Sequence, residues 1–124
     1  MELALSQSEW AVMECLWAES PRTLMQMVKE LEAATGWSAS TIKTMVGRMT
    51  AKGHIRYEEG GRARLYYPCL TREEAAARET ESLLRRAYRG KLGLLVNTMV
   101  DRQRLSDQEL EELYAILDRA KGGS

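Results

Sequence analysis

Three short amphipathic segments dominate the first half of the sequence and constrain its fold more than any other feature. Ser6 and Glu9 form a capping box ahead of the first segment, which predicts a helix over residues 7–18. Apolar residues recur at helical spacing over residues 23–34 and 39–52, so we expect two further helices there. Only a short turn separates the second helix from the third.

A glycine-centred hairpin follows the third helix. Residues 54–59 and 62–67 are strand-like and flank Gly60-Gly61, which supplies the turn of a tight reversal. The chain is thus expected to contain two helices, a short turn, a third helix and a hairpin, which is the order of elements in a winged helix-turn-helix. In that fold the third helix enters the major groove of DNA, and the hairpin, called the wing, lies along the phosphates.

The net charge of the chain is zero, but the charges are unevenly distributed. Residues 1–37 have a net charge of −4, from two bases and six acids, whereas residues 38–67 have +4, from six bases and two acids. Residues 68–100 and 101–124 contribute +2 and −2. A basic block is often only a solvated face, but this one coincides with the third helix and the hairpin, which points to a nucleic-acid partner.

The face of the third helix opposite its apolar stripe suits an approach to the edges of base pairs. It carries small and hydrogen-bonding side chains and two cations, without an acid: Ser40, Lys43, Thr44, Gly47, Arg48 and Ala51. A glycine inside a helix costs about 1 kcal/mol relative to alanine. Gly47 therefore indicates either a close approach of the helix backbone to another surface or tolerance at a site that nothing touches.

Arginines give the hairpin its positive charge. We expect Arg62 and Arg64 to contact phosphates, and strand alternation places them with Tyr66 on one face of the second strand. The alternative is that these arginines, together with Arg56, only keep an exposed hairpin soluble.

The composition changes near Leu70, where we expect a boundary between a DNA-binding domain, residues 1–70, and a helical region, residues 71–124. Three helices are expected in the second part, which cannot bury much apolar surface alone. We expect a symmetric copy to cover it, through residues that include Leu83, Leu84, Tyr88, Leu95, Met99, Leu110, Leu113 and Leu117. The alternative is packing against the first half. The predicted fold is mainly α with a small β-hairpin wing: a winged helix-turn-helix followed by a helical dimerisation region.

The composition argues against an enzyme. His54 is the only histidine and no aspartate precedes Asp101, so the groups that metal hydrolases, phosphoryl-transfer enzymes and catalytic triads bring together are lacking. No catalytic residue, metal site or cofactor is expected. Cys15 and Cys69 do not make a disulfide framework, and no signal peptide or membrane span is visible, so we expect a cytoplasmic protein.

Four stretches of the sequence carry a resemblance to a known family. They are Ser8-Glu9-Trp10-Ala11-Val12-Met13 with Leu16-Trp17, Trp37-Ser38 with Thr41-Ile42-Lys43-Thr44, Arg48-Met49 and Lys52-Gly53, Tyr66-Tyr67-Pro68, and Leu105-Ser106 with Glu109-Leu110-Glu111-Glu112-Leu113. Together they resemble the BlaI/MecI/CopY family of bacterial repressors, the penicillinase-repressor type, over essentially the whole chain. The resemblance implies a homodimer that binds double-stranded, inverted-repeat operator DNA and represses transcription of antibiotic-resistance or stress genes. It implies DNA contacts at Ser40, Thr41, Lys43, Thr44, Gly47 and Arg48.

The resemblance also bears on how the repressor is switched. Beta-lactam-responsive members are inactivated by cleavage of an Asn–Phe bond, triggered through a membrane sensor with a metallopeptidase domain. An ungapped reading places that bond at Thr98–Met99, with Asn97 one residue early, so both the bond and the mechanism stay open here. Copper-responsive members carry paired cysteines near the C-terminus, and since no cysteine follows Cys69, a metal switch of that kind is not expected.

The sequence leaves a second class of function open. A winged-helix module could use the same face of its third helix to bind a partner protein instead of DNA. Salt dependence separates the two classes, because phosphate contacts make DNA binding steeply salt-dependent.

Overall fold

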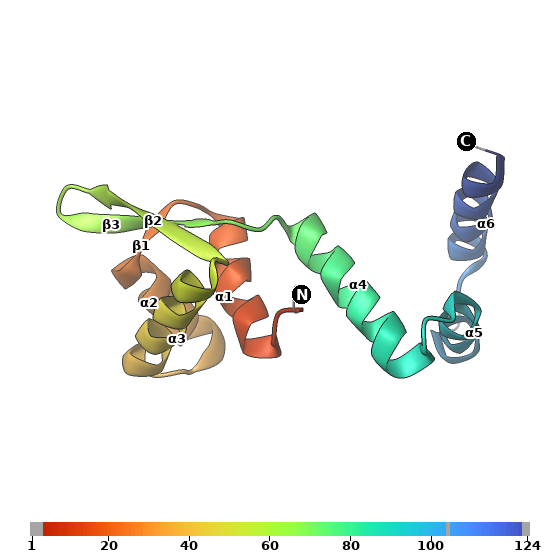
Figure 1. Cartoon of the computed structure of the whole chain (residues 1–124), viewed down its shortest axis with the longest axis horizontal. Helices are drawn as coiled ribbons and strands as arrows, with labels where there is room; N and C mark the ends of the chain where they lie inside the picture. The colour runs from red at the N-terminus through yellow and green to blue at the C-terminus, as the bar shows by residue number, and fades with distance from the viewer. Residues whose placement is uncertain (1–3, 104, 123–124) are drawn as a thin grey trace. The chain divides into compact units, whose positions relative to one another are not determined.

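The computed structural model describes residues 4–103 and 105–122, which form six helices and three strands (Figure 1). In chain order these are α1 (Gln7–Ala18), β1 (Arg22–Thr23), α2 (Leu24–Thr35), α3 (Ala39–Lys52), β2 (Ile55–Gly60), β3 (Ala63–Pro68), α4 (Arg72–Tyr88), α5 (Leu92–Gln103) and α6 (Asp107–Gly122). The chain divides into two compact units, the first ending at Ser82 and the second beginning at Leu83. The predicted mainly helical architecture with a hairpin after the third helix is confirmed.

Capping boxes start four of the helices. The Ser6 hydroxyl accepts a hydrogen bond from the backbone N–H of Glu9 at 3.1 Å, and the Glu9 carboxylate accepts one from the Ser6 N–H at 2.9 Å. The same reciprocal pair forms at three more helix starts: Thr23 with Gln26, Thr71 with Glu74, and Ser106 with Glu109. Each box satisfies N–H groups that have no partner within the helix, so these side chains determine where the helices begin.

The core of the first unit is built from one face of each of the first three helices, which gather beside the sheet (Figure 1). Each of these helices buries one apolar stripe: Val12, Met13, Cys15 and Leu16 of α1, Met27, Val28 and Leu31 of α2, and Ile42, Val46 and Met49 of α3. Ile55 of β2 and Tyr66 of β3 complete this core from the hairpin. Burial of these stripes fixes the rotation of each helix about its axis and hence which residues face outward.

The sheet has three antiparallel strands in the order β1-β3-β2, one more than the hairpin predicted from sequence. The additional strand is β1, in which Arg22 pairs with Tyr66 and Thr23 with Leu65. Two residues are too few to show an alternating pattern, so the sequence carries no signal for this strand. Its pairing ties the connection between α1 and α2 to the base of the wing.

The hairpin turn consists of Gly61 and Arg62, so the predicted Gly60-Gly61 turn is wrong by one residue. Gly60 still belongs to the ladder and pairs with Ala63. A Cβ on Gly60 would lie 2.8 Å from the Ala63 carbonyl oxygen and 2.8 Å from the Leu65 side chain, so this position excludes larger residues. Gly61 has φ +84°, a left-handed conformation that glycine adopts without strain. Arg62 therefore lies in the turn, and the prediction that it shares a strand face with Arg64 is wrong.

The second unit has little core of its own. Among its side chains whose exposure is described, none is buried. Several large apolar side chains of α5 and α6 are exposed, among them Leu92 at 60%, Leu117 at 54% and Tyr114 at 68%. No helix in the described part of the chain has the length and apolar character needed to cross a membrane.

Candidate nucleic-acid interface

Helix α3 has a capping residue at each end. The Ser38 hydroxyl accepts a hydrogen bond from the Thr41 N–H at 3.2 Å and starts the helix. Gly53, with φ +87°, ends it and donates its N–H to the last turn. The His54 N–H then donates to the Met49 carbonyl at 3.0 Å, so the wing begins directly at the C-terminus of α3.

The outward face of α3 contains every predicted DNA-contacting residue of this helix, and all of them are exposed: Ser40, Thr41, Lys43, Thr44, Gly47 and Arg48. A shallow hollow of about 270 Å³ lies on this face, lined by Ser40, Thr41, Thr44, Met45 and Arg48. Neither Lys43 nor Arg48 forms an ion pair with a described residue. Both cations are therefore available to an anion outside the chain.

Gly47 is not required by packing within the chain. A Cβ at this position would meet no atom within 4 Å, apart from the helix's own backbone. Its φ lies in the range open to all residues, so backbone conformation does not require glycine either. The open space is consistent with both explanations offered by the sequence, and replacement by alanine distinguishes them.

The wing holds two of its arginines against tyrosine rings and carboxylates, on opposite strand faces. Arg64 lies 4.1 Å from the centroid of the Tyr57 ring, and its Nε is 3.5 Å from the Glu59 carboxylate. A hydrogen bond with Tyr66 is the main cause that raises the pKa of Arg64, which stays charged.

Arg56 repeats this arrangement on the other face. It lies 4.2 Å from the centroid of the Tyr67 ring and 3.0 Å from the Glu58 carboxylate. Arg62 differs from both, because it lies in the exposed turn without an ion pair to any residue that the structure describes. The pairing of Arg64 with Glu59 was not predicted, because it depends on the register of β2 and β3. Arg56 and Glu58 are two residues apart on β2, so strand alternation could have indicated their pairing.

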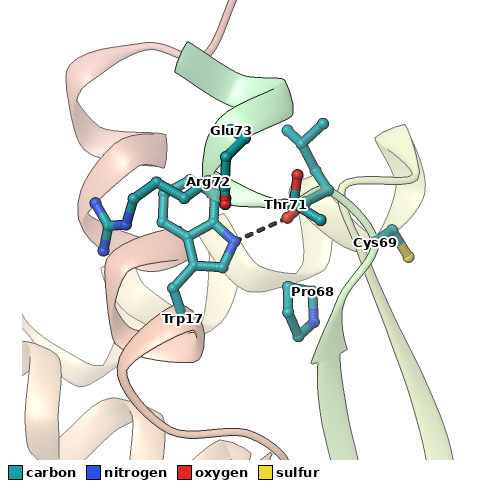
Figure 2. A pocket seen from close by; sticks show the side chains of 7 residues that line it. Trp17, Pro68, Cys69, Thr71, Arg72 and Glu73 are labelled. Carbon is teal, nitrogen blue, oxygen red and sulfur yellow. Dashed lines mark hydrogen bonds between the residues drawn. The ribbon is translucent and has the colours of Figure 1, made fainter. Parts of the chain in front are cut away.

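A hollow of about 460 Å³ lies where the wing passes into α4, lined by Trp17, Pro68, Cys69, Leu70, Thr71, Arg72 and Glu73 (Figure 2). The Trp17 indole N–H donates to the Leu70 carbonyl at 2.8 Å. The Arg72 guanidinium lies 4.9 Å from the centroid of a Trp17 ring and donates to the Glu14 carboxylate at 2.7 Å. The Trp17 N–H and the Arg72 guanidinium therefore both have partners within the chain.

The residues predicted for dimerisation all lie in the second unit. Met99 and Leu117 are exposed, and the others are half-buried: Leu83, Leu84, Tyr88, Leu95, Leu110 and Leu113. Tyr114, which was not among them, is the most exposed large apolar residue of this unit. Its place beside Leu110 and Leu117 on α6 is the signal that could have identified it.

The residues of the predicted cleavage switch lie within α5. Asn97, Thr98 and Met99 are all exposed, and the Thr98 hydroxyl donates to the Leu94 carbonyl at 3.0 Å.

No cluster of His, Cys, Asp or Glu side chains in residues 4–103 and 105–122 could hold a metal ion.

Comparison with known proteins agrees with this geometry. The sequence matches the penicillinase repressor family over residues 5–119. It is 32% identical over 117 residues to a penicillinase repressor of Bacillus licheniformis, covering 94% of this chain and 91% of the relative. It is 27% identical to the methicillin resistance regulatory protein MecI of Mammaliicoccus sciuri, covering 93% and 94%.

Solved structures agree with this family assignment. The solution structure of the DNA-binding domain of the repressor BlaI is similar, with a TM-score of 0.52 and 31% identity over 56% of this chain and 85% of that one. The Bacillus licheniformis BlaI monomer, solved in complex with the blaP half-operator, gives the same values. The predicted winged helix-turn-helix is thereby confirmed, and the chain belongs to the penicillinase repressor family.

Proposed function

We propose that this protein is a homodimeric transcriptional repressor that binds an inverted-repeat operator, and that it has no catalytic activity. The observation that carries the proposal is the outward face of α3, which has no acid and presents Lys43 and Arg48 without an ion pair to any described residue. Similarity to a BlaI structure bound to a half-operator supports DNA as the partner. A repressor of this kind acts where the DNA is, in the bacterial cytoplasm.

The proposed contacts divide by chemistry. Lys43, Thr44 and Arg48 lie toward base edges, where arginine and lysine pair with guanine and threonine can donate or accept. Ser40, Thr41 and Gly47 complete the surface that enters the groove. Arg62 and Arg64 of the wing contact phosphates, which adds affinity without sequence preference.

The proposed dimer forms through residues 71–124, with residues 1–70 as the DNA-binding domain. The support for it is the apolar surface of α5 and α6, which the single chain leaves exposed. Covering this surface with a second copy also supplies a second recognition helix. Two such helices related by a two-fold axis require DNA half-sites whose centres are separated by about one helical turn or a multiple of it.

We also propose Asn97, Thr98 and Met99 as the segment where proteolysis, in a pathway with a membrane sensor metallopeptidase, would inactivate the repressor. The exposure of all three side chains supports this assignment. Cleavage there would split α5 and so remove part of the proposed dimer surface. Loss of dimer after site-directed cleavage at this segment, measured by sedimentation, tests it.

One experiment tests the function as a whole. Duplexes with a randomised centre are selected on the full chain, and the enriched sequence is then titrated against non-specific competitor at two salt concentrations. We expect an enriched inverted repeat whose binding constant falls steeply with salt. A protein-interaction module would yield no enriched sequence and no steep salt dependence, and that result would overturn the proposal.

A further inference from the structure

The second unit carries a cluster of cations where α4 ends. Residues 83–91 contain four bases and no acid, and the chain turns there because Arg89 and Gly90 adopt φ values of +53° and +80°. We call Arg85, Arg89 and Lys91 the basic corner. All three are exposed, and none forms an ion pair with a residue in the described part of the chain.

The same unit carries a row of acids on α6. Asp107, Glu111 and Asp118 are spaced i, i+4 and i+11, which places them along one side of the helix. We call these three residues the acidic stripe. They too are exposed and form no ion pair with a described residue. The stripe borders the apolar side of α6, which includes Leu110 and Leu117.

Helix ends explain only part of this pattern. Asp107 lies in the first turn of α6 and Arg85 in the last turn of α4, where their charges suit the helix dipole. Asp118 lies in the second half of α6, where an acid gains nothing from that dipole, and Lys91 lies outside the helices. The helix dipole therefore does not account for the charges at these two positions.

We propose that in the dimer the basic corner of each copy lies against the acidic stripe of the other. This inference rests on the homodimer of the proposed function and adds what determines its register. An isologous interface makes such a contact twice, since the corner of one copy meets the stripe of its partner and the reverse. Apolar surfaces are poorly directional, so paired charges at their border select one alignment of the two copies.

A second copy suits the basic corner better than DNA does. The acidic stripe lies in the same unit and would repel phosphates, whereas a second copy supplies both the acids for the corner and the bases for the stripe. The net charge of zero also means that two whole chains approach without long-range repulsion.

Charge reversal on the full chain tests the inference. The variants are Arg89→Glu with Lys91→Glu, and Glu111→Lys with Asp118→Lys, and dimer dissociation constants are measured by sedimentation at low and high salt. We expect each double variant to dimerise about tenfold or more weakly than wild type at low salt, because like charges then meet twice. Mixed in equal amounts, the two variants should form a heterodimer close to wild-type affinity.

The outcomes separate this inference from the proposed function. Lys29→Glu with Glu32→Lys, an exposed exchange on α2, is the matched control and should leave dimerisation unchanged. If both reversed variants dimerise as wild type does, or if their mixture gains nothing, the inference is overturned while the homodimer stands. If reversal at the corner lowers DNA affinity with dimerisation intact, the corner binds DNA and the inference is equally wrong. A wild-type chain that stays monomeric would overturn the homodimer itself.

Discussion

The ammonium group of Lys52 lies 2.7 Å from the carboxylate of Glu9 and joins the end of α3 to the start of α1. The Glu9 carboxylate also accepts a hydrogen bond from the backbone N–H of Ser6, so one side chain caps the first helix and anchors the third. Its side chain is 12% exposed, whereas that of Lys52 is 57% exposed. Partial burial raises the pKa of Glu9, but the hydrogen bonds from Lys52 and Ser6 outweigh it and hold the pKa below its ordinary value of 4.5.

Neutralising Glu9 should lower stability in a pH-dependent way. Because the folded pKa lies below the unfolded one, the stabilisation is complete above the unfolded value and is lost as the pH falls through the folded value. We expect Glu9→Gln, which preserves the cap, to lower the free energy of unfolding by about 1 kcal/mol at neutral pH. Urea unfolding of both proteins should show this difference vanish in acid. Glu32→Gln on α2 is the control, and a difference that persists in acid would contradict the assignment.

Replacing Gly47 with alanine should separate stability from DNA binding. The space at Gly47 is open and alanine is the better helix former, so the free energy of unfolding should rise by about 0.5–1 kcal/mol. If the glycine allows close approach to DNA, affinity for the selected operator should fall about tenfold or more. Thermal melting and gel-shift titration measure the two effects.

Gly93→Ala in α5 is the control for Gly47→Ala, because the space beside Gly93 is equally open. It should not weaken operator binding when its dimerisation is that of wild type. Operator affinity that is unchanged in Gly47→Ala would show that this glycine reflects tolerance only.

Removing Arg62 should weaken binding to all DNA sequences alike. Its position in the exposed turn, without an ion pair to a described residue, suits a phosphate contact. Arg62→Ala should therefore make the slope of log binding constant against log salt less steep by about one unit, with unchanged preference for the operator. A loss of sequence preference at an unchanged slope would instead mean that Arg62 reads bases.

Neutralising Glu59 should strengthen DNA binding through Arg64. The carboxylate lies 3.5 Å from the Arg64 Nε and competes with a phosphate for it. Glu59→Gln should raise affinity about two- to fivefold at low salt, and Arg64→Ala should abolish that gain. Glu58→Gln is the matched control, because its partner Arg56 lies on the opposite strand face and outside the proposed contacts. Equal gains from both substitutions would show a general charge effect.

The helices of this protein could be predicted from the sequence because local features specify them. Capping pairs such as Ser6 with Glu9 mark their starts, and apolar spacing gives their buried faces. The outward face of α3 follows from the same spacing, since it lies opposite Ile42, Val46 and Met49. These inferences need no knowledge of distant parts of the chain.

Features that depend on strand register or on contacts between elements could not be predicted. Strand β1 exists only because Arg22 and Thr23 meet β3. The sequence does not distinguish Gly60 from Gly61 as the first residue of the turn. The structure does, because a side chain at Gly60 would be crowded within the ladder, whereas Gly61 has the positive φ of a turn residue. The pairing of Arg64 with Glu59 needs the strand register as well.

The link between Trp17 and Leu70 has a practical consequence for protein chemistry. It is continued by the contact of Arg72 with Glu14 and by Ala75, which is buried in the core of the first unit. A fragment that ends directly after the wing lacks the start of α4, so it would expose the surface of α1 around Trp17. Such a fragment is expected to be poorly soluble. A fragment that runs to Ser82 keeps this surface covered, and it is the piece we would isolate for spectroscopy on a half-operator.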